Sequence, residues 1–156
     1  MSKTLPLRPQ DARRPMHGNK TNVLRVPGGI VRELSPQELG WCGEEFACVY
    51  LEEQGFEIVT RNWTCPGGEA DIVARDGCDL VLVEVKTRLQ GRGRKRVVPE
   101  LAVDAAKRRR YLNIAACAAV AFDVDCLRFD VVAVTFSDGG YIEFRHLVDA
   151  FGDEAA

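Results

Sequence analysis

One stretch of this chain, GGEADIVARDGCDLVLVEVKTR at residues 67–88, constrains the fold more than any other. Apolar runs lie on both sides of the dipeptide Asp76-Gly77. Asp-Gly favours the tight turn that joins two antiparallel strands, and flanking apolar runs are the usual signature of a hairpin. The sequence therefore predicts a β-hairpin with strands at about residues 68–76 and 79–87.

This hairpin gathers carboxylates. Side chains on a strand alternate between its two faces, so Glu84 and Lys86 share one face, and Glu69 and Asp71 obey the same rule one strand earlier. The hairpin brings Asp71 and Glu84 toward one point. Two carboxylates about 4 Å apart repel by roughly 4 kcal/mol at an effective dielectric constant of about 20. A divalent cation and Lys86 would supply the positive charge that this pair needs.

The rest of the composition is that of an ordinary globular domain. The 156 residues are 46% hydrophobic and 28% charged, which fits one domain with its own core. No apolar run approaches the roughly 20 residues of a membrane span, and the N-terminus has no secretory apolar segment. The six cysteines form no Cys-x-x-Cys pair, which favours reduced thiols over zinc or disulfides. We expect a cytoplasmic protein without a membrane partner.

The chain divides by charge into a basic N-terminal segment and an acidic remainder. Residues 1–34 carry seven Lys or Arg and two acidic residues, whereas the whole chain has a net charge of −2. Repeated Pro and Gly interrupt any periodicity there, so we predict a flexible tail over 1–34, a folded domain over 35–150 and a short C-terminal tail over 151–156. Two roles for the basic tail stay open, namely solubility and holding nucleic acid.

A helix should begin after Ser35, because Ser-Pro-Gln-Glu combines a capping box with proline at the first helical position. It should end at about Gln54, before Gly55. Spacing at 100° per residue places Glu44 on a flank beside Ala47, where a carboxylate is unexpected. The predicted core stripe is Leu39, Cys42, Phe46, Val49 and Tyr50.

The remaining elements follow from apolar periodicity. Strands are predicted at 56–63, at the hairpin, at 128–136 and at 141–146. A second helix should start between Pro99 and Asp104 and run to about Ala121. The predicted order is α-β-β-β-α-β-β, an α/β fold.

The carboxylates suit phosphodiester hydrolysis. Mg²⁺ prefers oxygen ligands, uses one or two protein carboxylates, and activates water while neutralising phosphoryl oxygens. Asp71 and Glu84 fit that need, and Glu44 could complete the ligand set from the helix. Lys86 could orient the attacking water or neutralise developing charge. The predicted catalytic residues are Glu44, Asp71, Glu84 and Lys86.

Basic residues flank this acidic centre. Six of the eleven residues from Lys86 to Arg96 are Lys or Arg, and residues 107–110 are a run of four. Lys and Arg neutralise phosphates and release counterions, so this pattern predicts binding to a nucleic acid by recognition of its backbone or shape. The predicted nucleic-acid-binding residues are Arg88, Arg92, Arg94, Lys95, Arg96, Lys107 and Arg108.

Several motifs together resemble one known family. Over about residues 38–146 the chain is similar to the bacterial YraN family, which is similar in turn to archaeal Holliday-junction resolvases and the restriction-endonuclease-like superfamily. The motifs that carry the resemblance are Gly40, Gly43 and Glu44, then Arg61-Asn62-Trp63, GGEADIV, VEVKTR, PELAVDAAKRRR and Arg128-Phe129-Asp130.

The resemblance implies a restriction-endonuclease-like core, with a mixed central sheet of about five strands flanked by helices. In this core Asp71, Glu84 and Lys86 would be the superfamily's signature for binding Mg²⁺ or Mn²⁺. Glu44 would match the metal-side glutamate of the resolvases' first helix. The implied metal-binding set is Glu44, Asp71, Glu84 and Val85. Resolvases generally act as dimers, so the resemblance also points to a homodimer.

Two functions stay open from the sequence. The first is a metal-dependent endonuclease, a Mg²⁺-dependent phosphodiesterase that acts on structured or branched DNA. The second is a non-catalytic nucleic-acid-binding module of a repair, recombination or transformation assembly. Glu69 has two open roles as well, as a site residue or as a cap of the turn after Gly67-Gly68.

Overall fold

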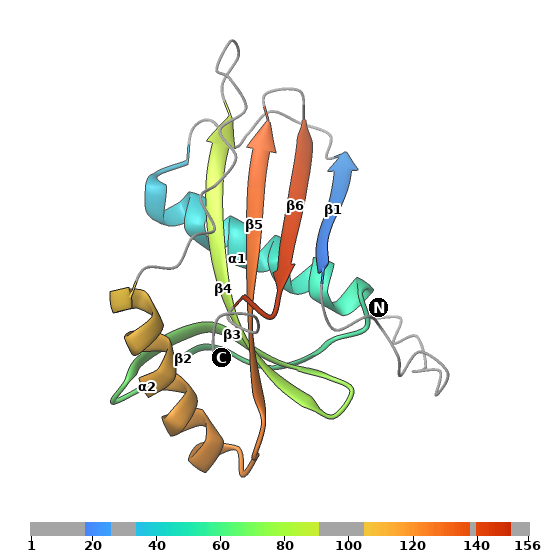
Figure 1. Ribbon diagram of the computed structural model, residues 1–156. Coiled ribbons are helices and arrows are strands. Elements are labelled where there is room, and N and C mark those ends of the chain that lie inside the picture. Colours follow the sequence, from blue (N-terminus) through green and yellow to red (C-terminus); the bar gives the residue numbers. More distant parts are fainter. Residues whose placement is uncertain (1–17, 26–33, 91–104, 138–139, 151–156) are drawn as a thin grey trace.

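Two helices lie on opposite faces of a single sheet (Figure 1). The computed structural model describes residues 18–25, 34–90, 105–137 and 140–150. The elements are β1 (Gly18–Arg25), α1 (Pro36–Glu53), β2 (Glu57–Cys65), β3 (Gly68–Asp76), β4 (Asp79–Gln90), α2 (Ala105–Ala121), β5 (Leu127–Ser137) and β6 (Tyr141–Val148).

The sheet is mixed. Its strands lie in the order β1-β6-β5-β4-β3-β2, and β4 and β5 are parallel while every other neighbouring pair is antiparallel. The parallel pair needs a crossover, and α2 lies within it. The predicted α/β fold and the element order from α1 to β6 are confirmed.

One strand was not predicted. β1 pairs with β6 from Gly18 opposite Val148 to Arg25 opposite Tyr141, and Figure 1 shows the two strands side by side at the edge of the sheet. The prediction of a flexible tail is therefore wrong for these eight residues. Without β1, the outer edge of β6 would expose unpaired backbone groups, and a strand can cover them through its backbone alone. Residues 1–17, 26–33 and 151–156 of the predicted tails lie outside the described residues.

The start of α1 is as predicted. The Ser35 backbone N–H donates to Glu38 Oε2 at 2.7 Å, and the Glu38 N–H donates to Ser35 Oγ at 3.2 Å, which completes the capping box. The helix runs to Glu53 with Gln54 as its C-cap, and Gly55 follows with φ of 93°, a conformation that suits glycine.

The predicted core stripe of α1 is wrong at Val49, which is 47% exposed. The buried side of the helix instead contains Gly43, Ala47, Cys48, Tyr50 and Leu51. Small residues decide this orientation, since a Cβ at Gly43 would lie only 1.9 Å from Thr87 Oγ1 of β4. The close approach of α1 to β4 turns the flank of Glu44 toward the sheet, so the side chain of Glu44 is only 17% exposed.

The other boundaries differ from the predicted ones by a few residues. β2 extends two residues beyond Trp63, and β4 extends to Gln90. The second helix is described from Ala105 to Ala121, and its predicted start lies outside the described residues. No helix among the described residues is long and apolar enough to span a membrane.

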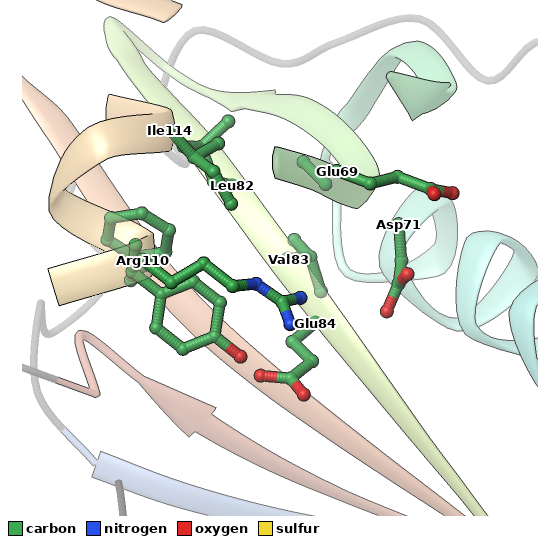
Figure 2. A pocket seen from close by; sticks show the side chains of 10 residues that line it. Glu69, Asp71, Leu82, Val83, Glu84, Arg110 and Ile114 are labelled. Carbon is green, nitrogen blue, oxygen red and sulfur yellow. The ribbon is translucent and has the colours of Figure 1, made fainter. Parts of the chain in front are cut away.

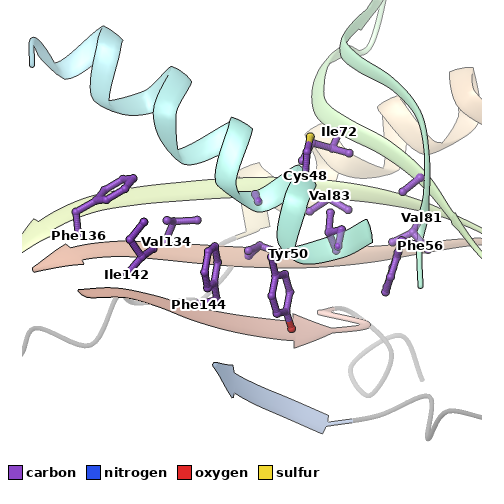
Figure 3. Close-up of a cluster of buried hydrophobic side chains, with 14 residues drawn as sticks. Cys48, Tyr50, Phe56, Ile72, Val81, Val83, Val134, Phe136, Ile142 and Phe144 are labelled. Carbon is purple, nitrogen blue, oxygen red and sulfur yellow. The ribbon is translucent and has the colours of Figure 1, made fainter. Parts of the chain in front are cut away.

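Two apolar clusters hold the layers together. The larger one joins α1 to one face of β3–β6, with the Tyr50 ring stacked on that of Phe144 at 5.0 Å (Figure 3). The smaller one joins α2 to the other face through Tyr111, Ile114 and Leu82. Side chains of β4 alternate between these clusters, with Val81 and Val83 in the first and Leu80 and Leu82 in the second. The candidate site lies where this alternation reaches charged residues.

Candidate active site

The β2–β3 pair is kinked beside the predicted site. Arg61 pairs with Ile72 and Trp63 pairs with Ala70, which leaves Asn62 and Asp71 at the step between them. Asn62 has φ of 49°, a left-handed conformation that is uncommon for a residue inside a strand. Ala70 and Ile72 pack in different clusters on opposite faces, although strict alternation would place them together. The kink therefore sets Asp71 where β3 changes face.

Asp71 is tied to β4 by its carboxylate. The β3–β4 ladder ends at Ile72 opposite Val83, and two residues later the Val85 N–H donates to Asp71 Oδ2 at 2.8 Å. A carboxylate thus replaces a strand partner at the end of the ladder. This bond fixes Asp71 beside Glu84, and it brings the backbone of Val85 to the same place.

Asp71 is held in an unfavourable electrostatic environment. Burial raises the pKa of its carboxyl to about 6, the Val85 N–H acts against that rise, and the negative charges of Glu44, Glu84 and Glu69 add to it. The carboxylates of these four residues therefore interact electrostatically. Since like charges disfavour ionisation, a further positive charge beside Asp71 would favour its ionised form.

Glu44 reaches this cluster from α1. Burial raises the pKa of its carboxyl, Arg61 opposes that rise, and the charge of Glu69 reinforces it. Arg61 Nη2 lies 4.0 Å from Glu44 Oε2, and the side chain of Asn62 hydrogen-bonds to Glu44. The left-handed Asn62 thus links the helix carboxylate to the kinked hairpin. Arg61 also pairs with Glu45 at 2.5 Å.

Lys86 shares the α2 side of β4 with Glu84, as the alternation of the strand predicts. Burial lowers the pKa of the Lys86 ammonium, Glu84 acts in the opposite direction, and Lys107 of α2 lowers it further. Two ammonium groups thus meet between β4 and α2. The two lysines thus place positive charge beside the carboxylate of Glu84.

A hollow between α2 and the sheet opens at these carboxylates (Figure 2). Figure 2 shows Glu84 and Asp71 on neighbouring strands, with Arg110 extending from α2 toward Glu84. Apolar side chains form the other walls. The lining residues are Glu69, Ala70, Asp71, Leu82, Val83, Glu84, Arg110, Tyr111, Ile114 and Phe129.

The glycines of the GGEADIV motif allow α2 to approach this closely. A Cβ at Gly67 would lie 2.7 Å from the backbone carbonyl carbon of Asn113, so a side chain there would displace the helix. Gly68 has φ of 140° and faces Ile114 and Arg110. Glu69, for which two roles stayed open, lines the hollow and is exposed.

The donor groups fit a hard divalent cation, since carboxylates and a backbone carbonyl such as that of Val85 are the ligands that Mg²⁺ and Mn²⁺ prefer. Among the described residues, however, no three His, Cys, Asp or Glu side chains lie close enough to hold a metal ion as they stand. Mutual repulsion separates carboxylates, and side chains at binding sites commonly change rotamer on binding. A bound cation would have to draw them together.

The structure locates some of the predicted nucleic-acid-binding residues. Arg88 is exposed near the end of β4, and Lys107 is exposed in the first turn of α2 beside Lys86. Arg108 is half-buried. The other four predicted contacts, Arg92, Arg94, Lys95 and Arg96, lie outside the described residues.

Arg110 is absent from the predicted binding residues. The run Lys107–Arg110 contains four basic residues within about one helical turn, so the sequence of charges alone does not show which of them lies near the sheet. The later positions give the signal. Tyr111 and Ile114 are buried against the sheet, and Arg110 lies next to that face. A register anchored on these two apolar residues would have selected Arg110.

A second polar cluster surrounds Asp130 and is buried. Arg128 Nε donates to Asp130 Oδ1 at 2.9 Å, and His146 Nε2 lies 2.7 Å from Asp130 Oδ2. Tyr50 Oη lies 3.2 Å from His146 Nδ1, so with a neutral ring the hydroxyl donates to Nδ1 and Nε2 donates to the carboxylate. Arg128 also reaches Asp76 at 3.0 Å.

Comparison with known proteins agrees with the motifs. Residues 43–134 match the model of the Uncharacterised protein family UPF0102. A UPF0102 protein of Geobacter metallireducens is 43% identical over 76% of this chain and 95% of that protein. One of Arthrobacter sp. is 45% identical over 70% and 92%, and one of Chloroflexus aurantiacus is 35% identical over 76% and 96%. The chain therefore belongs to the UPF0102 family, the YraN family that its motifs resemble.

Proposed function

We propose that this protein is a metal-dependent endonuclease that acts on structured or branched DNA. The observation that carries the proposal is the state of Asp71. Its carboxylate is fixed by the Val85 N–H, yet burial and the charges of Glu44, Glu84 and Glu69 raise its pKa to about 6. Groups with strongly shifted pKa values in a hollow are candidates for function, because a fold gains no stability from them.

A divalent cation bound there would activate a water molecule and neutralise charge on the phosphoryl oxygens. Asp71 and Glu84 would hold the cation from the two strands, Glu44 would approach from α1, and the Val85 carbonyl could add a neutral ligand. Asn62 and Arg61 would orient Glu44, as they contact it in the structure. The hard oxygen donors favour Mg²⁺ or Mn²⁺ over softer metals.

Lys86 would act on the substrate. Its ammonium donates hydrogen bonds and accepts none, so it can orient the attacking water or stabilise charge that develops on the phosphate. Burial and the neighbouring Lys107 disfavour the charged form of Lys86. An arriving phosphate would relieve this repulsion, which favours binding of an anion at that position.

The substrate would be held through its backbone by Arg88, Lys107 and the basic residues that follow β4. Neutralising Arg92, Arg94, Lys95 and Arg96 together should weaken DNA binding. The slope of log affinity against log salt should fall by about 0.9 for each lost contact with duplex phosphate. An unchanged slope would exclude these four residues from the interface.

Calorimetric titration with Mn²⁺ tests the site directly. Wild-type protein should bind Mn²⁺, while Asp71→Ala and Glu84→Ala should lose detectable binding because each removes a ligand. Glu52→Ala is the matched control, since Glu52 is an exposed carboxylate of α1 outside the cluster. Equal binding by Asp71→Ala and the control would eliminate the proposed metal site.

A cleavage assay then separates enzyme from binding module. A panel of duplex, nicked, flapped and four-way DNA is incubated with Mg²⁺ or Mn²⁺. Lys86→Ala should abolish cleavage and leave Mn²⁺ binding at least as tight as in wild type, because the ammonium ligates nothing. Wild-type protein that binds DNA equally well with and without metal, and cuts nothing in the panel, would be a non-catalytic nucleic-acid-binding module instead.

A further inference from the structure

Arg110 lines the hollow between α2 and the sheet, and its guanidinium suits a phosphate group. We propose that Arg110 binds a phosphodiester of the substrate, so that the substrate strand passes over the α2 side of β4. This inference rests on the proposed function, and it adds the path of the substrate and a residue outside the predicted binding set.

The stem of Arg110 is positioned by packing. Its Cγ would lie 3.6 Å from a Cβ built on Gly68, an ordinary van der Waals distance, so the arginine stem passes over this glycine. Among the described residues, the guanidinium contacts the ring of Tyr111, with Cζ 5.8 Å from the ring centroid. Tyr111 is itself 6% exposed, which makes it a rigid support. An arginine held by a stem and a ring loses less entropy on binding.

The guanidinium lies at the rim of the hollow with Glu84 and Glu69, while Leu82, Ile114 and Phe129 line its apolar part. Figure 2 shows the planar group of Arg110 directed toward Glu84. A carboxylate cluster alone repels a phosphate. A cation at its edge offsets this repulsion at the place where an anionic strand would have to approach.

The spacing of α2 and β4 supports the same path. Lys107 and Arg110 are three residues apart on α2 and therefore lie on one side of the helix. Lys107 affects Lys86, and Arg110 shares the hollow with Glu84. Glu84 and Lys86 are themselves alternate residues on one face of β4. Lys107 and Arg110 of α2 thus lie near Lys86 and Glu84 of β4, respectively.

Arginine suits this position better than lysine would. The guanidinium can donate two parallel hydrogen bonds to a phosphate, whereas an ammonium acts as a point charge. Arg109 provides the matched comparison. It has the same charge, is exposed on the same turn of α2, and does not line the hollow.

The experiment measures binding of fluorescent duplex and four-way DNA in EDTA across a salt series, for wild type, Arg110→Ala, Arg110→Lys and Arg109→Ala. Arg110→Ala should bind about 10-fold more weakly, and its salt slope on duplex should fall by about 0.9, the value of one phosphate contact. Arg110→Lys should keep the slope and lose about 3-fold in affinity, as expected for a lost bidentate contact. Arg109→Ala should change affinity less than 2-fold.

The outcomes separate the two proposals. If wild type binds DNA and Arg110→Ala matches Arg109→Ala in affinity and slope, the role of Arg110 is overturned while the proposed function stands. If wild type binds no DNA under any condition, the proposed function fails and the ligand assigned to Arg110 fails with it. A purely structural role for Arg110 would lower the melting temperature of Arg110→Ala without changing the salt slope, and this result would also overturn the inference.

Discussion

The two polar clusters of the sheet differ in how the charge of their buried aspartate is compensated. Around Asp130, the guanidinium of Arg128, the ring of His146 and the Asp149 N–H all bind the carboxylate. Burial there opposes ionisation, but the hydrogen bonds from His146 and Arg128 outweigh it and lower the pKa of Asp130. Around Asp71 one N–H binds the carboxylate, the other near charges are mostly negative, and the pKa rises.

This difference separates structure from function. Asp130 and His146 are each 1% exposed, so a substrate cannot reach them, and their charge is compensated from within the chain. Asp71 lines a hollow, and its charge is left for an external cation. A protein that keeps carboxylates in mutual repulsion gives up stability there, which is the usual relation between active sites and folding. Variants in the two clusters should therefore change stability in opposite directions.

The largest effect should come from Arg128→Met. This change keeps the length of the stem but leaves Asp130 and Asp76 without their guanidinium partner. Removing one partner of a buried ion pair costs about 3–5 kcal/mol, because a buried charge stays behind. Urea denaturation of Arg128→Met should show this loss in the free energy of unfolding.

The exposed Arg109→Met is the control for that experiment, and surface substitutions of this kind stay within about 0.5 kcal/mol. A loss below about 1 kcal/mol for Arg128→Met would mean that water compensates Asp130 as well as arginine does. The contrast between the clusters would then disappear.

A smaller effect of opposite sign should come from Asp71→Asn. Asparagine can still accept the Val85 N–H and has no charge to bury. Because the pKa of Asp71 is about 6 in the folded state and 3.8 is its ordinary value, the folded state binds more protons than the unfolded state between these values. Wild-type stability therefore falls as pH rises through this window, and the variant escapes that loss.

Denaturation at several pH values checks this sign. Asp71→Asn should be more stable than wild type by about 2–3 kcal/mol at pH 8. The gain should nearly vanish by about pH 3.5, where the Asp71 carboxyl is mostly protonated in both the folded and the unfolded state. Asp125→Asn, at an exposed aspartate between α2 and β5, should show no such trend. Saturating Mn²⁺ should restore wild-type stability but leave Asp71→Asn unchanged, since a ligand stabilises only the state that binds it.

Local signals in the sequence predicted the frame of the site. The Asp76-Gly77 turn with its flanking apolar runs gave the hairpin, and the capping box at Ser35 gave the start of α1. Strand alternation placed Glu84 and Lys86 on one face of β4. Each of these features depends on neighbours a few residues away, so the chain specifies them without tertiary contacts.

Features that depend on distant contacts were not predictable. β1 forms because β6 offers it an edge, and Val49 is exposed because Gly43 sets the rotation of α1 against β4. The left-handed Asn62 and the reach of Arg110 depend on the packing of three elements. In each case tertiary packing determines which of several conformations forms, and the periodicity of the sequence does not distinguish between them.

The smallest expected effect concerns the way in which α1 positions Glu44 in the cluster. Two glycines of α1 provide the test variant and its control. A Cβ at Gly43 would lie 1.9 Å from Thr87 Oγ1 and 2.8 Å from Thr87 Cβ, whereas a Cβ at Gly40 has nothing within 4 Å. Gly43→Ala must therefore push α1 away from β4, at a cost of about 1–2 kcal/mol for an overpacked contact. Gly40→Ala should instead stabilise by about 0.5–1 kcal/mol, because alanine is the better helix former. Because Glu44 follows Gly43 directly, Mn²⁺ affinity should weaken in Gly43→Ala and stay unchanged in Gly40→Ala. Equal Mn²⁺ affinity in the two variants would show that Glu44 does not hold the cation and that the metal site belongs to the hairpin alone.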